Sequence, residues 1–219
     1  MAKKMNKDKA SSMTCVRSYS KQNFRAAEDD SGSTIVGHPA VFDSMADIGG
    51  WFGEIIDRGA FDDCDMTDVL FFVNHNMNKI PLARSRRNNG KSTMTLTIDD
   101  VGLNMEAHLD TDNNEEARAV YSAVSRGDMD GMSFCFRVKE QTWENLDTDY
   151  PTRHITKIAK VYEVSAVNEP AYEDTDISAR AKEALENARA AVETARSAKS
   201  LDSDTEIEVY RLKNEILSK

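Results

Sequence analysis

Apolar and polar residues alternate along much of the chain, and this period of two predicts β-strands. Residues 92–110, STMTLTIDDVGLNMEAHLD, alternate on both sides of a turn-forming Asp-Asp-Val-Gly and predict a hairpin. Residues 153–167, RHITKIAKVYEVSAV, predict one long strand. Residues 68–76, DVLFFVNHN, form a continuous apolar run that is typical of a buried strand and ends abruptly in an Asn-His-Asn cluster. The central part of the chain is therefore predicted to be mainly β.

Two segments have the period of a helix instead. In residues 113–126 a capping box formed by Asp112 and Glu115 precedes apolar residues at helical spacing, and Gly127 supplies the stop. The second segment contains ARAKEALENARAAVETARSAKS, which lacks glycine and proline and is rich in strong helix formers. Its narrow apolar stripe, mostly of small side chains, is Ala181, Leu185, Ala188, Val192 and Ala195. It predicts a solvated helix or a weak partner-binding helix.

Charge and composition divide the chain into three parts. Residues 1–26 contain seven Lys and Arg against the single acid Asp8, although the whole chain carries a net charge of −10. We interpret residues 1–15 as a disordered basic tail, residues 16–176 as one mainly β domain with helices (α+β), and residues 177–219 as a helical extension. A basic arm on an acidic body makes a dedicated nucleic-acid-binding protein an unfavourable interpretation.

Several classes of protein fit the sequence poorly. The three cysteines are far apart and form no CxxC motif, which favours free thiols in a reducing compartment over disulfides or a zinc site. No apolar run approaches the roughly 20 residues of a membrane span, and no secretory leader is evident. DTDNNEEA begins like a calcium loop but has Glu115 and Tyr121 where glycine and glutamate are needed. We therefore expect a soluble intracellular protein with no metal and no cofactor.

Residues 130–136, DGMSFCF, place a lone serine in a strand-like run just after a glycine. In a strand the bulky apolar residues point to one face, and Ser133 and Cys135 point to the other. A serine becomes a nucleophile only when a base takes its proton. His75, at the end of the buried apolar run, is the best-placed base among the four histidines, and an ordinary turn histidine is the alternative.

A second unusual residue is Glu163, a carboxylate on the apolar face of the 153–167 strand. Such a group is costly to bury without a hydrogen-bond partner, and a histidine N–H is a good one. An edge strand with that face exposed is the other interpretation. His154 begins the same strand, with opposite parity to Glu163, and Cys135 is a candidate thiol nucleophile.

Five stretches occur together in a recognisable order: GHPAVFDSMADIGGWFGEIIDRGAFDD, FFVNHNMNKIPLARS, DDVGLNMEAHLD, SRGDMDGMSFCFRV and YEVSAVNEPAYEDTDI. In this order and spacing they closely resemble the prohead maturation proteases of tailed bacteriophages, which are distant relatives of the herpesvirus assemblins. The resemblance runs from about residue 35 to residue 178.

The resemblance implies roles for individual residues. Ser133 falls on the family's nucleophile, His75 on its general base and Glu163 on its acidic third member. The assemblins use a second histidine in the third position, so His154 remains the alternative there. Cys135 departs from the small residue expected after Ser-Phe. The oxyanion candidates are the backbone N–H groups near Gly131 and Met132, and the side chain of Arg84.

The resemblance also implies a small assemblin-like β-barrel surrounded by helices. The expected activity is that of a serine endopeptidase acting inside the procapsid, in the host cytoplasm. The expected substrates are scaffold protein, or a scaffold-like part of the major capsid protein, and the protease itself. Residues 177–219 would then be a targeting arm and a candidate for removal by self-cleavage; self-association is left open. Two alternatives remain: an inactive capsid-associated scaffolding protein of the same fold, and a Cys135 thiol hydrolase.

Overall fold

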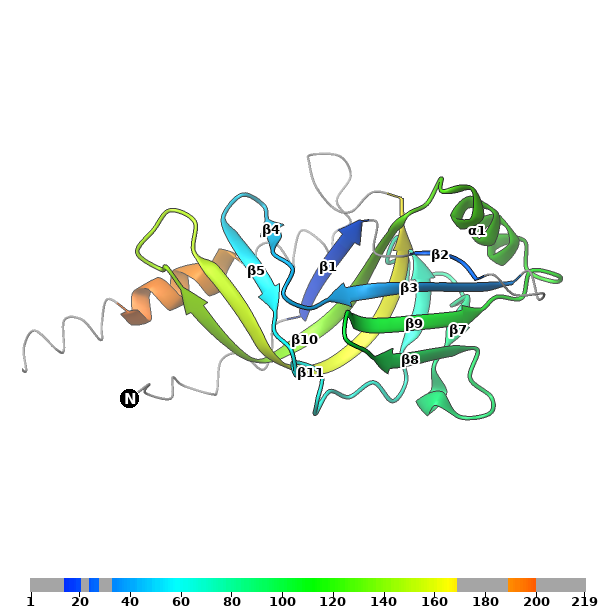
Figure 1. Ribbon diagram of the computed structural model, residues 1–219, viewed down its shortest axis with the longest axis horizontal. Helices are drawn as coiled ribbons and strands as arrows, with labels where there is room; N and C mark the ends of the chain where they lie inside the picture. Colours follow the sequence, from blue (N-terminus) through cyan, green and yellow to red (C-terminus); the bar gives the residue numbers. More distant parts are fainter. Residues whose placement is uncertain (1–13, 21–23, 28–32, 169–188, 200–219) are drawn as a thin grey trace, which may run out of the picture.

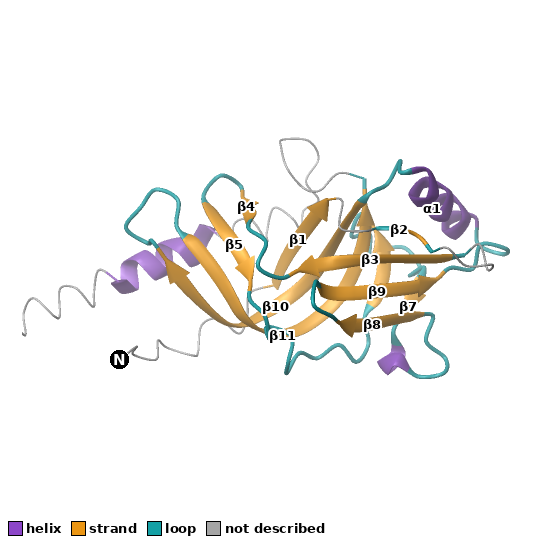
Figure 2. Ribbon diagram, in the orientation of Figure 1, coloured by secondary structure: helices purple, strands orange, loops and turns teal. Residues whose placement is uncertain are grey.

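The computed structural model describes residues 14–20, 24–27, 33–168 and 189–199, and its strands form two sheets (Figures 1 and 2). The larger sheet has the order β1-β10-β11-β5-β4, with β6 beside β11 and β7 beside β6. Its strands are β1 (Thr14–Ser20), β4 (Ala46–Ile48), β5 (Phe52–Ile56), β6 (Leu70–Val73), β7 (Ala83–Arg84), β10 (Gly131–Glu144) and β11 (Thr152–Val167). The smaller sheet has the order β2-β3-β9-β8, formed by β2 (Arg25–Ala26), β3 (Thr34–Val41), β8 (Met94–Ile98) and β9 (Gly102–His108).

The hairpin of β10 and β11 is the centre of the larger sheet. The two antiparallel strands are 14 and 16 residues long, and their register places Ser133 opposite Ser165. Register shifts between Cys135 and Gln141 interrupt the ladder, and such bulges bend a strand pair. β11 pairs in parallel with β5 near its start and with β6 near its end. The end of the hairpin that carries Ser133 therefore lies between β1 and β6.

The hydrophobic core combines side chains from both sheets. Met132, Phe134, Phe136 and Val138 are fully buried, as their alternation in the sequence predicts. The rings of Phe134 and Phe136 stack with centroids 4.4 Å apart. These residues share one core cluster with side chains of β3, β8 and β9. Burying one face of β10 in this way leaves Ser133 on the opposite face.

Helix α1 (Glu115–Arg126) lies where the sequence predicts a helix, but its N-terminus differs in detail. The cap is Asn114, whose side-chain oxygen accepts hydrogen bonds from the backbone N–H groups of Glu116 and Ala117, at 3.0 and 3.3 Å. The predicted Asp112 capping box is therefore wrong. Gly127 closes the helix in the left-handed conformation, at φ 76°. A short 3₁₀ turn, η2 (Arg86–Asn88), follows β7.

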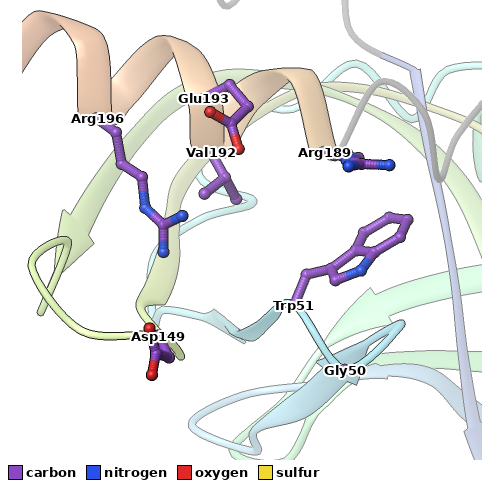
Figure 3. A pocket seen from close by; sticks show the side chains of 7 residues that line it. All are labelled: Gly50, Trp51, Asp149, Arg189, Val192, Glu193 and Arg196. Atoms are coloured by element: carbon purple, nitrogen blue, oxygen red, sulfur yellow. The ribbon is translucent and has the colours of Figure 1, made fainter.

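Residues 189–199 form a second helix, beside the tip of the β10–β11 hairpin and far from α1 (Figure 1). Val192 packs in a small apolar cluster with Ala46, Ile48 and Phe52, against which Trp143 also lies. The Arg189 guanidinium lies 5.3 Å from the centre of the Trp51 ring. The cavity between this helix and the β4–β5 turn, about 170 Å³, is lined by Gly50, Trp51, Asp149, Arg189, Val192, Glu193 and Arg196 (Figure 3).

The architecture agrees with the predicted mainly β class with helices but not with the expected barrel. Within the described ranges, the strands form two sheets and no closed barrel. The part of the extension that is described, residues 189–199, is helical. The predicted basic tail and the rest of the extension lie outside the described residues. None of the described helices is long and apolar enough to cross a membrane.

Candidate active site

Three strands bring the candidate site together. Ser133 is the third residue of β10, Glu163 lies on the neighbouring β11, and His75 follows the end of β6. Because β6 runs parallel to β11, its end lies beside the last residues of β11, with Val73 opposite Ala166. The backbone N–H of Asn74 extends this pairing by donating to the Ala166 carbonyl at 2.9 Å. The histidine is thus delivered to the β10–β11 pair at the level of Ser133.

The three side chains form a continuous hydrogen-bonded series. His75 Nε2 is 2.6 Å from Ser133 Oγ, and His75 Nδ1 is 2.5 Å from Glu163 Oε1. Because a carboxylate only accepts, Nδ1 donates to Glu163 and leaves the Nε2 lone pair facing the serine hydroxyl. Ser133 and Glu163 are fully buried, and the His75 side chain is 11% exposed. This is the geometry that turns a serine hydroxyl into a nucleophile.

The backbone of the histidine turn is in an uncommon conformation. Asn74 and His75 have φ angles of 49° and 56°, in the left-handed region that residues other than glycine seldom adopt. The turn is held by a hydrogen bond from the Asn76 N–H to the Val73 carbonyl at 3.0 Å. Such backbone strain concentrates at functional sites, where neighbouring contacts maintain it. Here it aims the imidazole back over the sheet.

Ser133 has a further partner on β1. Its Oγ lies 2.8 Å from the Arg17 carbonyl oxygen, and the two strands are paired here with Ser18 opposite Ser133. The single hydroxyl proton of Ser133 therefore has two acceptors within reach, the imidazole and the carbonyl. Contacts on both sides fix the position of the oxygen.

Residues 20–190 match the family model described as Caudovirus prohead serine protease. The chain belongs to this family. No curated protein and no solved structure matched it. The match spans all three residues of the hydrogen-bonded series, and a serine hydroxyl activated by histidine is the chemistry that a serine protease requires.

The fold does not bring His154 to this site. His154 lies opposite Thr142, far along the hairpin from Ser133, and its Nδ1 is 2.8 Å from Asp57 Oδ1. Distance along the strand therefore separates His154 from Glu163, and the register shifts between them remove the simple parity argument. The two other histidines are also engaged elsewhere, His38 with Asp99 at 2.8 Å and His108 with Thr34 at 2.7 Å.

The oxyanion candidates differ in their surroundings. Gly131 and Met132 lie within the strand ladder directly before Ser133, paired with both β1 and β11. Arg84 is on the exposed side of β7, where its Nε donates to Asp68 Oδ1 at 2.6 Å. This hydrogen bond holds the pKa of Asp68 below its ordinary value. Among the described residues no contact joins Arg84 to Ser133 or His75.

The three cysteines, all within the described residues, form no disulfide. Cys135 is buried on the Ser133 face of β10, directly opposite Glu163. Cys64 lies away from this face, and burial raises its pKa to about 12. A thiol nucleophile needs a lowered pKa, so Cys64 is unsuited to that role.

Two participants were missed by sequence reasoning. Ser165 Oγ donates to Glu163 Oε2 at 2.7 Å and accepts from the His75 backbone N–H at 3.3 Å. The Arg17 carbonyl contacts Ser133 as described above. Ser165 had a signal, because two residues after Glu163 it shares the same strand face. The Arg17 contact had none, since a backbone carbonyl is independent of residue type.

Solvent reaches the site beside His75. An open groove of about 540 Å³ lies between the histidine turn and α1. Its lining is rich in amide side chains: Val73, Asn74, His75, Asn76, Met77, Asn78 and Glu116. Amide groups can hydrogen-bond a peptide backbone, so the groove is chemically suited to an extended peptide.

Proposed function

We propose that Ser133, His75 and Glu163 form the catalytic triad of a capsid maturation protease. The observation that carries this proposal is the single imidazole placed between the serine hydroxyl at 2.6 Å and the buried carboxylate at 2.5 Å. The carboxylate fixes the tautomer, the imidazole accepts the serine proton, and the strand holds the serine rigidly.

In the proposed reaction, His75 Nε2 takes the Ser133 proton while Oγ attacks the carbonyl carbon of a peptide bond. The resulting imidazolium is stabilised by Glu163 and then gives its proton to the departing amine. Water, deprotonated by His75, hydrolyses the acyl-enzyme and regenerates Ser133. Backbone N–H groups near Gly131 and Met132 are the proposed donors to the oxyanion, a role that requires them to be released from the strand ladder in which both residues are paired.

The proposed substrates follow from the family. A prohead serine protease cleaves capsid proteins in general, and we propose scaffold protein or a scaffold-like part of the major capsid protein, cut inside the procapsid. We also propose self-cleavage after Tyr172, which itself lies outside the described residues. Residues 189–199 are packed helix, whereas cleavage needs locally unfolded backbone, so the KSLDSDTE break is favoured over this part of the helix.

The decisive experiment is co-expression of the full chain with its neighbouring capsid and scaffold proteins, followed by mass mapping of the new termini. The matched control is the Ser133→Ala variant. Cuts in the capsid proteins that depend on Ser133 would support the proposal. Equal cutting by Ser133→Ala, or cutting blocked by iodoacetamide but not by a serine-directed phosphonate, would assign the chemistry elsewhere.

A further inference from the structure

We propose that Ser165 is a positioning residue of the active site, acting through Glu163 and His75 rather than on the substrate. The inference rests on the proposed function, because it assigns Ser165 a role in activating Ser133. It starts from an unexplained feature of β11: a second fully buried serine, directly across the ladder from the first.

The first step concerns the carboxylate. Glu163 is fully buried, and its two oxygens have different partners: Oε1 accepts from His75 Nδ1 at 2.5 Å and Oε2 from Ser165 Oγ at 2.7 Å. A buried carboxylate needs a donor for each oxygen, because it has lost its water. Ser165 therefore fixes the rotation of the carboxylate about its last bond, so that Oε1 faces the imidazole.

The second step concerns the histidine backbone. The Ser165 oxygen also accepts from the His75 N–H at 3.3 Å. This N–H belongs to a residue with φ 56°, a conformation that requires supporting contacts. One hydroxyl thus joins the base and the group that orients it. Displacing it would change the position of the imidazole and the direction of the carboxylate together.

The third step separates this role from nucleophilic attack. The only hydroxyl proton of Ser165 is donated to Glu163, and His75 Nε2 points to Ser133. Ser165 therefore has no imidazole nitrogen available to deprotonate it. Its polarity serves the carboxylate, which explains why a serine occupies a buried strand position between Ser133 and Phe72.

The test needs no known substrate. The full chain is treated with a fluorophosphonate probe, and the labelled serine is identified by peptide mapping. We expect Ser165→Ala to lower the maximal labelling rate of Ser133 by about 10–100-fold, by analogy with the loss of a hydrogen-bond partner behind a metal ligand, with unchanged probe affinity. Ser85→Ala is the matched control, because Ser85 is also fully buried and its Oγ also accepts from a backbone amide, that of Val69 at 2.9 Å.

A spectroscopic measurement separates positioning from general destabilisation. The proton between His75 Nδ1 and Glu163 should give a low-field NMR signal, recorded in a Ser133→Ala background to prevent self-digestion. Ser165→Ala should move or abolish this signal, and Ser85→Ala should leave it unchanged. If Ser165→Ala does not fold, the Ser165 hydroxyl proton can be sought in the Ser133→Ala protein, where hydrogen bonding to a buried carboxylate should slow its exchange.

The outcomes discriminate between the two proposals. Wild-type labelling of Ser133 in Ser165→Ala, an unmoved low-field signal, or a rapidly exchanging Ser165 hydroxyl would each overturn the positioning role while leaving the triad intact. A parent protein that is not labelled at Ser133 would overturn the proposed function, and the NMR measurements would still decide the Ser165 network. A label on Ser165 would overturn both.

Discussion

Two glutamates are buried in the same sheet, and their partners differ. Glu54 on β5 is 1% exposed and is bound by two guanidinium groups: Arg17 on β1, through a bidentate pair, and Arg153 on β11, whose Nη1 lies 3.0 Å away. Glu163 on β11 is bound by an imidazole and a hydroxyl. One carboxylate is held by permanent cations and the other by groups that can exchange protons.

The difference decides what each carboxylate can do. Burial by itself raises the pKa of Glu54, but the charges and hydrogen bonds of Arg17 and Arg153 outweigh it and hold that pKa below its ordinary value. A guanidinium does not release its proton at biological pH, so the Glu54 cluster can only join strands. An imidazole can take a proton and return it, so the same residue type beside His75 can support chemistry.

The largest expected effect comes from a substitution in the hydrogen-bonded series that contains Glu163. Ser133→Ala should lower proteolysis by about 10⁶-fold, the usual cost of losing a triad serine, while leaving the fold intact. Turnover of a mapped capsid-protein cleavage site measures this. Proteolysis by the purified variant at a near-native rate would remove Ser133 from the mechanism.

Glu163→Gln should lower turnover by about 10²–10⁴-fold, because it removes the charge that stabilises the imidazolium and no longer enforces the useful tautomer. The loss is smaller than that for Ser133→Ala, since the nucleophile remains. Turnover is measured with the same peptide, and circular dichroism controls for folding. Near-normal turnover by the Glu163→Gln variant would mean that another residue is the third member of the triad.

Glu54→Ala should act on stability instead. It leaves the Arg17 and Arg153 charges buried without their partner, and breaking a buried ion pair in this way costs about 3–5 kcal/mol. Urea unfolding measures the loss. The comparison with Glu163 fails if Glu54→Ala retains wild-type stability but loses turnover.

The Glu54 cluster should also make stability depend on acid. Because the folded-state pKa of Glu54 is lowered, its contribution is fully present above the unfolded-state pKa and is lost as the pH falls through the folded-state value. The melting temperature of the wild type should therefore fall as the pH is lowered. The Glu54→Gln variant should have a lower melting temperature than the wild type at neutral pH, and its melting temperature should fall less over the same acid range. Parallel plots of melting temperature against pH for the two proteins would contradict this.

The smallest expected effect is that of His154→Ala. His154 pairs with Asp57 on the surface side of the hairpin, away from Ser133, so its loss should leave turnover almost unchanged. A crippled His154→Ala enzyme beside a normal Glu163→Gln enzyme would indicate the assemblin pattern of two histidines.

Local patterns predicted the elements that carry the site. The alternation around Ser133 correctly placed Phe134 in the core, and the abrupt end of the apolar run singled out His75. The structure joins Ser133, His75 and Glu163 in one hydrogen-bonded series, while their catalytic roles stay a prediction. These features could be predicted because each depends on a few residues that are neighbours in the sequence.

Contacts between strands that are distant in the sequence could not be predicted from local patterns. The parallel pairing of β6 with β11 decides that His75 meets Glu163, and periodicity does not specify which strands pair. The expected barrel is not confirmed, because the described strands form two sheets without closure, and closure depends on which edges meet. The cap lies at Asn114, two residues after the predicted Asp112, and the local pattern does not separate them because aspartate and asparagine are equally good caps.

The contact between Arg17 and Ser133 has a consequence for the order of folding. The two residues are 116 positions apart, and β1 is the first described strand of the chain whereas β10 and β11 are among the last strands. Pairings of such long sequence separation form late, after the loop between them has been closed at an entropic cost. A ribosome-bound chain from which β10 and β11 have not yet emerged lacks Ser133 and Glu163 at the site. The proposed triad therefore cannot assemble until β11 has been synthesised.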